Sequence, residues 1–236
     1  MNRSSMGQLS TGLFQSLSRA RARLEMKRGR IGRATPLSRE FGYDRGQPID
    51  RHYIEGFLAA NSAHIRGNVL EIGDATYSQR FGGDRITRQD ILHVHAGNPI
   101  ATIVGDLSDP TVLPSSRFDY IILTQTLHLI FDMPRAIAQI HRSLRPGGVA
   151  LITVPGITPI DTDEWRESWY WSLTGRALQQ LLSGPFDAGK VHLAEFGNLF
   201  AATAFLHGAA VEDVDPAKLD RFDSTYPVTV AARAEA

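Results

Sequence analysis

The chain has 236 residues, 42% of them hydrophobic and 21% charged, a balance typical of a folded globular protein with one sizeable core. It contains no cysteine, which excludes disulfide frameworks, thiolate zinc sites and cysteine nucleophiles. No apolar run approaches ~18 residues, so we expect no membrane-spanning segment.

The formal net charge is zero, but the charges are unevenly distributed. Residues 1–45 carry ten basic and three acidic residues, which leaves the rest of the chain acidic. We interpret residues 1–45 as a basic extension, partly helical or disordered, before a domain over residues 46–236. A helix making weak contact with a membrane surface or partner stays open, as does a targeting segment, because the head is rich in arginine and serine. The lack of a signal-peptide core favours a cytoplasmic protein, and the recurring Arg/Ala bias is typical of bacterial coding.

The first half of the domain alternates between helical and strand patterns. Apolar residues at helical spacing predict a helix that Asp50 is placed to cap and that leads into the first strand. Short apolar runs predict strands over 69–72, 91–95, 101–104, 118–123 and 149–154, with a helix over 134–144.

The second half departs from simple alternation. An aromatic loop over 157–171 precedes a predicted helix at 173–182, a strand at 191–196, a helix at 198–210 and a strand at 226–232. Strands that are almost continuously apolar, alternating with helices, indicate an α/β fold with a mostly parallel sheet covered on both faces.

Four motifs follow one another in this framework. They are VLEIGD from Val69, GDL from Gly105, FDYIILTQTLHLI from Phe118 and LRPGGVALITVP from Leu144. Their order and spacing resemble the class I S-adenosylmethionine-dependent methyltransferases, mainly over residues 49–155. The resemblance implies a three-layer Rossmann-like fold with a seven-stranded sheet and an antiparallel last strand. It also implies S-adenosylmethionine as cofactor and methyl transfer to a small-molecule or glycan acceptor, foremost a hydroxyl.

The same resemblance suggests roles for the first two motifs. Gly73 would let the backbone approach the methionine part of the cofactor, because it has no Cβ. Glu71 would face the cofactor's ammonium, and Asp74 belongs to the same turn. Asp106 would bind the adenine amine while Leu107 covers the ring.

Later positions complete the expected site. Thr124 and Gln125 follow the fourth strand and would lie beside the methyl group. His128 is the candidate general base for a hydroxyl acceptor, since histidine titrates near neutral pH; the alternative is that it only packs there. Asp119, at the opposite end of that strand, is interpreted as structural.

Two departures from the family pattern limit the prediction. Ala75 and Tyr77 replace the second and third glycines of the expected loop, so Tyr77 either stacks near the ligand or re-aims the loop. No acid ends the second strand, where His95 is the candidate ribose ligand. An alternative function is therefore a binding or accessory module without transfer activity, or a protein with non-methylating chemistry in natural-product biosynthesis.

Other candidates have weaker support. His93 and His95 point the same way on a strand, but no further ligand completes a metal site, and we expect no metal. The acids Asp161, Asp163 and Glu164 fit a solvated loop better than a magnesium site. Trp165, Trp169, Tyr170 and Trp171 either anchor the loop or line an acceptor pocket. The acidic domain disfavours nucleic acid as substrate.

Overall fold

The computed structural model describes residues 34–236. The compact domain begins at Leu37, earlier than the boundary expected at residue 46. The Leu37 N–H donates to the carbonyl of His207 at 2.6 Å, and Arg45 forms an ion pair with Asp213 at 2.7 Å. Residues 37–45 are thus part of the domain, whereas the predictions for the basic head before residue 34 lie outside the described residues.

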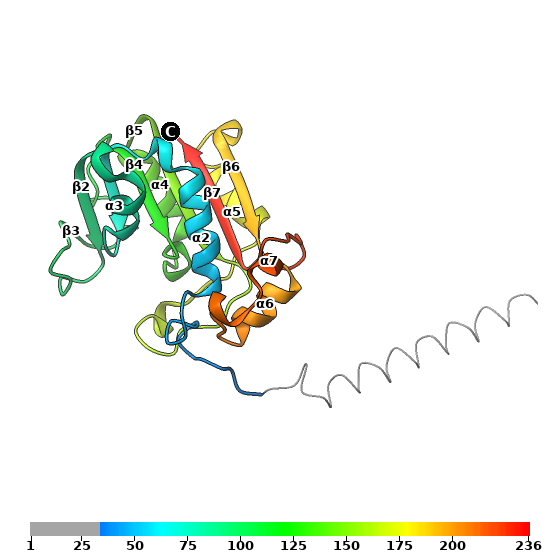
Figure 1. The fold of residues 1–236 in the computed structure, drawn as a ribbon. Coiled ribbons are helices and arrows are strands. Elements are labelled where there is room, and N and C mark those ends of the chain that lie inside the picture. The colour runs from blue at the N-terminus through cyan, green and yellow to red at the C-terminus, as the bar shows by residue number, and fades with distance from the viewer. Residues whose placement is uncertain (1–33) are drawn as a thin grey trace, which may run out of the picture. The chain divides into compact units, whose positions relative to one another are not determined.

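A seven-stranded sheet in the order β3-β2-β1-β4-β5-β7-β6 forms the middle layer (Figure 1). Its strands are β1 (Gly67–Ile72), β2 (Ile86–His93), β3 (Ile103–Val104), β4 (Phe118–Thr124), β5 (Leu144–Pro155), β6 (Val191–Phe196) and β7 (Thr229–Glu235). The pairings from β3 to β5 are parallel, and β7 runs antiparallel to both β5 and β6. The expected sheet with an antiparallel last strand is confirmed.

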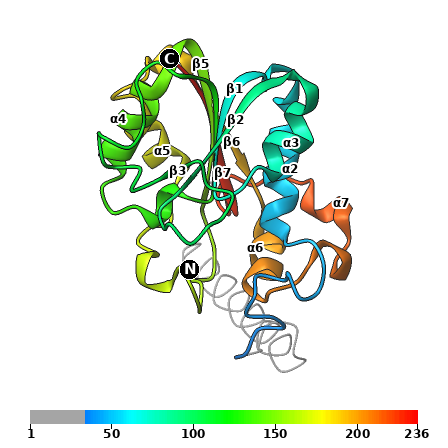
Figure 2. The same cartoon turned by 90° about the vertical axis from the view of Figure 1, so that its left-hand side faces the viewer.

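Helices cover both faces of this sheet (Figure 2). One face carries α4 (Met133–Ser143) and α5 (Gly175–Leu182), and the other carries α2 (Ile49–Ala60) and α3 (Thr76–Gly82). Two further helices, α6 (Leu199–Leu206) and α7 (Pro216–Leu219), pack beside the start of α2. Among the described residues, no helix has the length and apolar character needed to cross a membrane.

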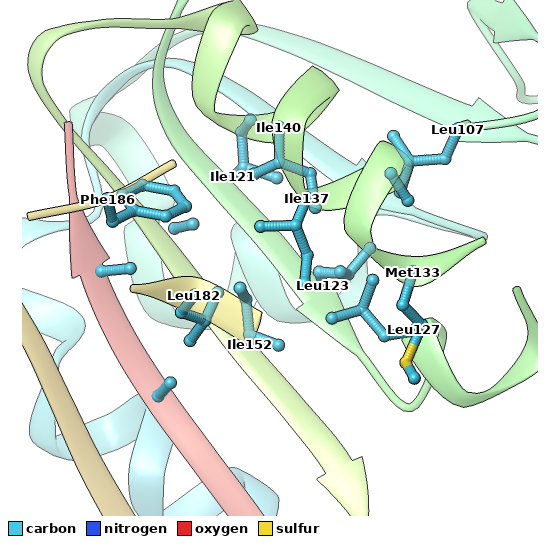
Figure 3. Packing of buried hydrophobic residues seen from close by; sticks show 14 of the residues in the cluster. Leu107, Ile121, Leu123, Leu127, Met133, Ile137, Ile140, Ile152, Leu182 and Phe186 are labelled. Atoms are coloured by element: carbon cyan, nitrogen blue, oxygen red, sulfur yellow. The ribbon is translucent and has the colours of Figure 1, made fainter. Parts of the chain in front are cut away.

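Strand β4 shows why the pattern of apolar residues is continuous rather than alternating. Ile121 and Leu123 point to the face of α4, where they share a buried cluster with Ile137 (Figure 3). Tyr120 and Ile122 belong to the cluster on the opposite face. Because successive side chains of a strand point to opposite faces, a strand covered on both sides must be apolar throughout.

Several boundaries differ from the prediction. Asp50 does not cap α2: Pro48 precedes the helix, and the Asp50 carboxylate lies buried in its first turn. Strand β2 begins earlier and ends at His93, so His95 lies in the following turn. Helices α3 and α7 were not predicted, because neither short segment carries a clear apolar period.

Candidate active site

A cleft of about 1250 Å³ lies at the carboxyl ends of the parallel strands. Its floor includes residues at or just after the ends of β1, β2 and β4, and its wall includes residues from the segment before α2 and the loop after β5. Figure 1 shows these last two segments at the same end of the sheet. Open α/β sheets bind ligands at this edge, because the helix connections leave a crevice there.

Gly73 provides the bare stretch of backbone in this cleft. Its φ of 90° is in the region that favours glycine, and a Cβ added to it would meet no atom within 4 Å. Its N–H donates to the Leu92 carbonyl at 2.9 Å, and its own carbonyl accepts from the side chain of Asn98 at 2.6 Å. The turn is therefore held from the β2 side while its upper surface is open to a ligand.

The carboxylate of Glu71 makes hydrogen bonds within the protein. Its side chain is 2% exposed, and its two carboxylate oxygens accept the backbone N–H groups of Tyr77 at 3.0 Å and Ser78 at 2.7 Å. Burial raises the pKa of Glu71 to about 7, although these N–H donors act in the opposite direction. Glu71 lines the cleft while its oxygens fix the start of α3, and its contact with the ammonium, directly or through water, stays a prediction.

Helix α3 gives the substituted glycine loop its form. Tyr77, at the third glycine position, lies in the first turn of α3, and its ring packs on Phe81 with 6.2 Å between ring centroids. Asp74 accepts the Thr76 N–H at 2.8 Å. Both Asp74 and Tyr77 line the cleft. The loop therefore continues directly into a helix, and its residues stay beside the site.

Arg51 is one of the cleft residues that the sequence pattern did not indicate. It projects from α2, and its Nη1 donates to the hydroxyl of Tyr77 at 3.5 Å. Burial disfavours its charge, but Asp50, 3.8 Å away, raises the pKa of Arg51 above its ordinary value. Its Nε is buried and has no hydrogen-bond partner among the described residues. Nothing in the sequence distinguishes Arg51 from a basic residue on an exposed helix face, so its place in the cleft could not be predicted.

The opposite part of the cleft carries the residues expected to hold the nucleoside. His93 and His95 both line it, and the His95 N–H donates to Nδ1 of His93 at 3.1 Å. Asp106 is exposed, with one oxygen accepting the Ser108 N–H at 2.7 Å. Leu107 is 5% exposed and belongs to the core cluster under α4 while contributing to the cleft wall (Figure 3).

The end of β4 is conformationally strained. Thr124 is the last residue of β4, and Gln125 follows it with a φ of 45°, uncommon for a residue with a side chain. The Gln125 N–H donates to the carbonyl of Thr153 at 2.9 Å, which holds this turn against β5. Its Oε1 is buried without a partner among the described residues. Such strain often marks a functional turn.

His128 lies in a short 3-10 turn at Leu127–Leu129 and is 1% exposed. The ring of Trp169 packs edge-on against its imidazole at 4.4 Å between centroids. Neither ring nitrogen of His128 has a partner among the described residues, nor does Nε1 of Trp169. Burial, together with the charge of Arg51, lowers the pKa of His128 to about 3. The imidazole is therefore neutral at physiological pH and a weak base.

The aromatic loop after β5 has both roles that the sequence left open: one tryptophan anchors the loop, and others line the cleft. Trp171 anchors it, because its Nε1 donates to the Ile130 carbonyl at 3.2 Å. Trp165 and Trp169 line the cleft, and Trp169 also stacks on Phe41 at 5.8 Å. Phe41 was assigned to the extension and now forms part of the wall.

One acidic residue of this loop, Asp161, binds the loop's own backbone. Asp161 accepts the N–H groups of Asp163 at 3.3 Å and Trp165 at 2.9 Å. Among residues 34–236, no group of three or more His, Asp or Glu side chains is arranged to hold a metal ion. Asp119, expected to be structural, accepts from the Asn68 N–H at 2.8 Å and from Arg145, at the end of the sheet away from the cleft.

The residues present fit S-adenosylmethionine. The bare backbone at Gly73, the carboxylate of Asp106 beside apolar Leu107, and buried polar atoms with no partner in the described part of the chain suit a ligand with an amino acid end and a nucleoside end. Together with a sheet of this strand order and its antiparallel β7, these features define a class I S-adenosylmethionine-dependent methyltransferase.

Comparison with known proteins agrees with this class. A family model described as a methyltransferase domain matches residues 40–185, and the chain belongs to that family. Malonyl-acyl-carrier-protein O-methyltransferase from Serratia marcescens is 28% identical over 147 residues, covering 57% of this chain. The chain likewise spans only 57% of that relative's length.

Solved structures share the fold. A SAM-dependent methyltransferase from Archaeoglobus fulgidus has a TM-score of 0.52 at 12% identity, covering 79% of this chain and 94% of that one. The cyclase SpnF has a TM-score of 0.51 at 16% identity, covering 81% of this chain and 83% of that one. At these identities the likeness concerns the fold alone.

Proposed function

We propose that this protein transfers a methyl group from S-adenosylmethionine to an oxygen atom of a small acceptor. The observation that carries the proposal is the cleft that joins the Gly73 turn to Trp169 and the buried His128 against which it packs. One end offers a bare backbone to a cofactor, and the other carries aromatic rings and an imidazole whose buried nitrogens have no partner among the described residues. The methyltransferase family to which the chain belongs supports the transfer of a methyl group.

The cofactor, when bound, supplies an electrophilic methyl group on a sulfonium centre. In our proposal Gly73 and Asp74 line the methionine part, Arg51 binds its carboxylate, and Tyr77 supports Arg51. A guanidinium suits this task because it stays charged and donates to carboxylates in a fork. Because both oxygens of Glu71 already accept N–H groups at the start of α3, we assign the ammonium to Gln125 Oε1, a buried acceptor without a partner among the described residues.

The nucleoside end rests on the other residues of the cleft. Asp106 accepts from the adenine amine, Leu107 covers the ring, and His93 with His95 binds the ribose hydroxyls. Thr124, at the end of β4, lies beside the reacting methyl group in this arrangement.

Several features support an oxygen-centred small acceptor. The relative from Serratia marcescens is named as an O-methyltransferase. Aromatic rings, Phe41 and Trp169 among them, line this end of the cleft, which suits a small molecule or one end of a glycan. The acidic balance of the chain after residue 45 speaks against nucleic acid.

Calorimetric titration with S-adenosylmethionine and with S-adenosylhomocysteine tests the cofactor part. We expect micromolar binding of both, weakened at least tenfold by Asp106→Ala, and release of S-adenosylhomocysteine when an acceptor is supplied. No binding at millimolar ligand would refute the proposal. Tight binding without release from any acceptor would instead favour a binding or accessory module, or the non-methylating chemistry left open by the sequence.

A further inference from the structure

We propose that the exposed rings of Phe131 and Tyr170 form an outer subsite of the cleft, and that this subsite holds a sugar ring of an acceptor longer than the reacting unit. This inference rests on the proposed function. Of the two acceptors that suit the cleft, a small molecule and one end of a glycan, it selects the glycan. In the transfer, the O–H bond of a sugar hydroxyl is replaced by O–CH₃ while the C–S bond of the sulfonium breaks. The electron pair of that bond stays on sulfur, and the proton passes to water.

Phe131 and Tyr170 are aromatic side chains that the fold leaves in contact with solvent. Phe131 is 69% exposed and Tyr170 is 49% exposed, and both line the cleft. The ring of Phe131 lies 5.4 Å from that of Tyr170 and 5.7 Å from that of Trp171, measured between centroids. Large apolar side chains that gather on a surface mark binding sites, whereas single ones need no explanation. Because Phe131 and Tyr170 line the cleft and are still exposed, they lie at its mouth, further out than the half-buried Trp169.

Hydrogen bonds hold the backbone under these rings in place. The carbonyl of His128 accepts the N–H of Tyr170 at 3.1 Å and that of Trp171 at 3.3 Å. The Nε1 of Trp171 donates to the carbonyl of Ile130, the residue before Phe131, at 3.2 Å. The loops after β4 and β5 are therefore tied together beneath the aromatic rings. A ligand at the outer subsite meets a surface that is already formed, so its binding does not have to order either loop.

The polar groups beside the rings indicate the chemistry of the occupant. The charged residues that these two loops contribute to the cleft are all acids, namely Asp132, Asp161 and Asp163. Asp132 directly follows Phe131, and both Asp132 and Asp163 are exposed. Carboxylates accept hydrogen bonds from hydroxyl groups and repel phosphates and other acids. A sugar ring has C–H groups on its faces, which stack on aromatic rings, and hydroxyls around its edge, which suit these carboxylates.

The size of the cleft favours an acceptor of more than one ring. Its volume of about 1250 Å³ exceeds the ~300–1,000 Å³ that is typical of a site for one small ligand. The cleft thus has room for the cofactor and for an acceptor that extends from Trp169 outward to Phe131 and Tyr170. We therefore expect the reacting sugar to lie inside the cleft and a neighbouring sugar to lie on the outer subsite.

The first experiment measures binding to the S-adenosylhomocysteine complex of the unmodified full-length chain by calorimetric titration. The sugar probes are the methyl glycosides of glucose, mannose and galactose, each paired with a trisaccharide of the same sugar. Choline and 1-hexanol represent a cationic and an aliphatic occupant of the outer subsite. We expect at least one trisaccharide to bind about tenfold more tightly than its methyl glycoside, because only the trisaccharide reaches Phe131 and Tyr170. No gain in any of the sugar series, or tighter binding of choline or 1-hexanol than of every sugar, overturns the inference.

The second experiment removes one aromatic ring but keeps an apolar side chain. Because Phe131 is exposed, Phe131→Leu leaves the core intact. It should weaken binding of the best trisaccharide about tenfold, and it should leave the affinities for the methyl glycoside and for S-adenosylhomocysteine within about twofold. Phe131→Trp should retain trisaccharide binding, since a flat ring is kept.

Phe222→Leu is the matched control, because Phe222 is 56% exposed and lies outside this cleft. It should change none of these affinities. Equal trisaccharide affinity in Phe131→Leu and the unmodified chain overturns the assignment of the outer subsite. Failure of S-adenosylhomocysteine to bind the unmodified chain would instead count against the proposed function itself.

Discussion

The carboxylate of Glu71, at the end of β1, accepts the backbone N–H of Ser78 at 2.7 Å and so ties the first strand to the start of α3. The same carboxylate accepts the Tyr77 N–H. In this loop Ala75 and Tyr77 replace two expected glycines. The buried carboxylate of Glu71 fixes the path of the chain there, beside the cofactor cleft.

This arrangement predicts a pH dependence of stability. The folded-state pKa of Glu71 is about 7, above the ordinary 4.5. Its contribution to stability is therefore fully present below pH 4.5 and is lost as the pH rises through 7. We expect the unfolding free energy of the wild type, measured relative to Glu71→Gln, to fall by on the order of 3 kcal/mol over this range. Urea unfolding at several pH values measures it, and a difference that grows with pH contradicts it.

The lowered pKa of His128 predicts a pH dependence of stability with the opposite sign. Its pKa in the folded protein is lowered to about 3 from 6.5, mainly by burial. Protonation therefore favours the unfolded chain as the pH falls below 6.5. We expect the wild type to lose, relative to His128→Phe, a stability on the order of 4 kcal/mol between pH 7 and pH 3. The same unfolding series detects this, and a difference independent of pH would show that the imidazole is solvated.

Gly73 permits a test that separates strain from ligand contact. Gly73→Ala should cost ~1–2 kcal/mol of stability because its φ is positive, and the new methyl group would project into open space at the cleft. We expect cofactor affinity to fall at least tenfold in calorimetric titration.

Gly147 is the matched control for this substitution. It has a φ of 76°, open space at its Cβ position and no place in the cleft. Gly147→Ala should therefore carry a similar cost in stability with unchanged cofactor affinity. Equal losses of affinity in both variants would mean that strain alone explains the effect.

Arg51 should contribute to cofactor affinity through its charge. We expect Arg51→Met to weaken S-adenosylmethionine binding roughly tenfold to hundredfold, since hydrogen bonds to charged groups are worth ~1.5–3 kcal/mol. Arg80→Met is the control, because Arg80 pairs with Glu55 at 2.8 Å and lies outside the cleft. Unchanged affinity in Arg51→Met would remove this residue from the cofactor site.

Sequence periodicity determined much of the architecture. The apolar runs around Val69, Ile121 and Leu151 predicted central strands, because a strand buried on both faces has no room for polar side chains. The glycine turn and the motif order then indicated the class. Short elements were missed: α3 has seven residues and α7 has four, too few for a helical period to be recognised.

What only the tertiary structure decided is the site itself. The sequence cannot reveal that Glu71 is turned toward α3, that Phe41 meets Trp169, or that Arg51 lies near His128. Each of these contacts joins different elements, and burial rather than residue type sets the pKa of Glu71 and of His128. Local pattern thus determined which elements form, while desolvation and packing between distant segments determined what the cleft can do.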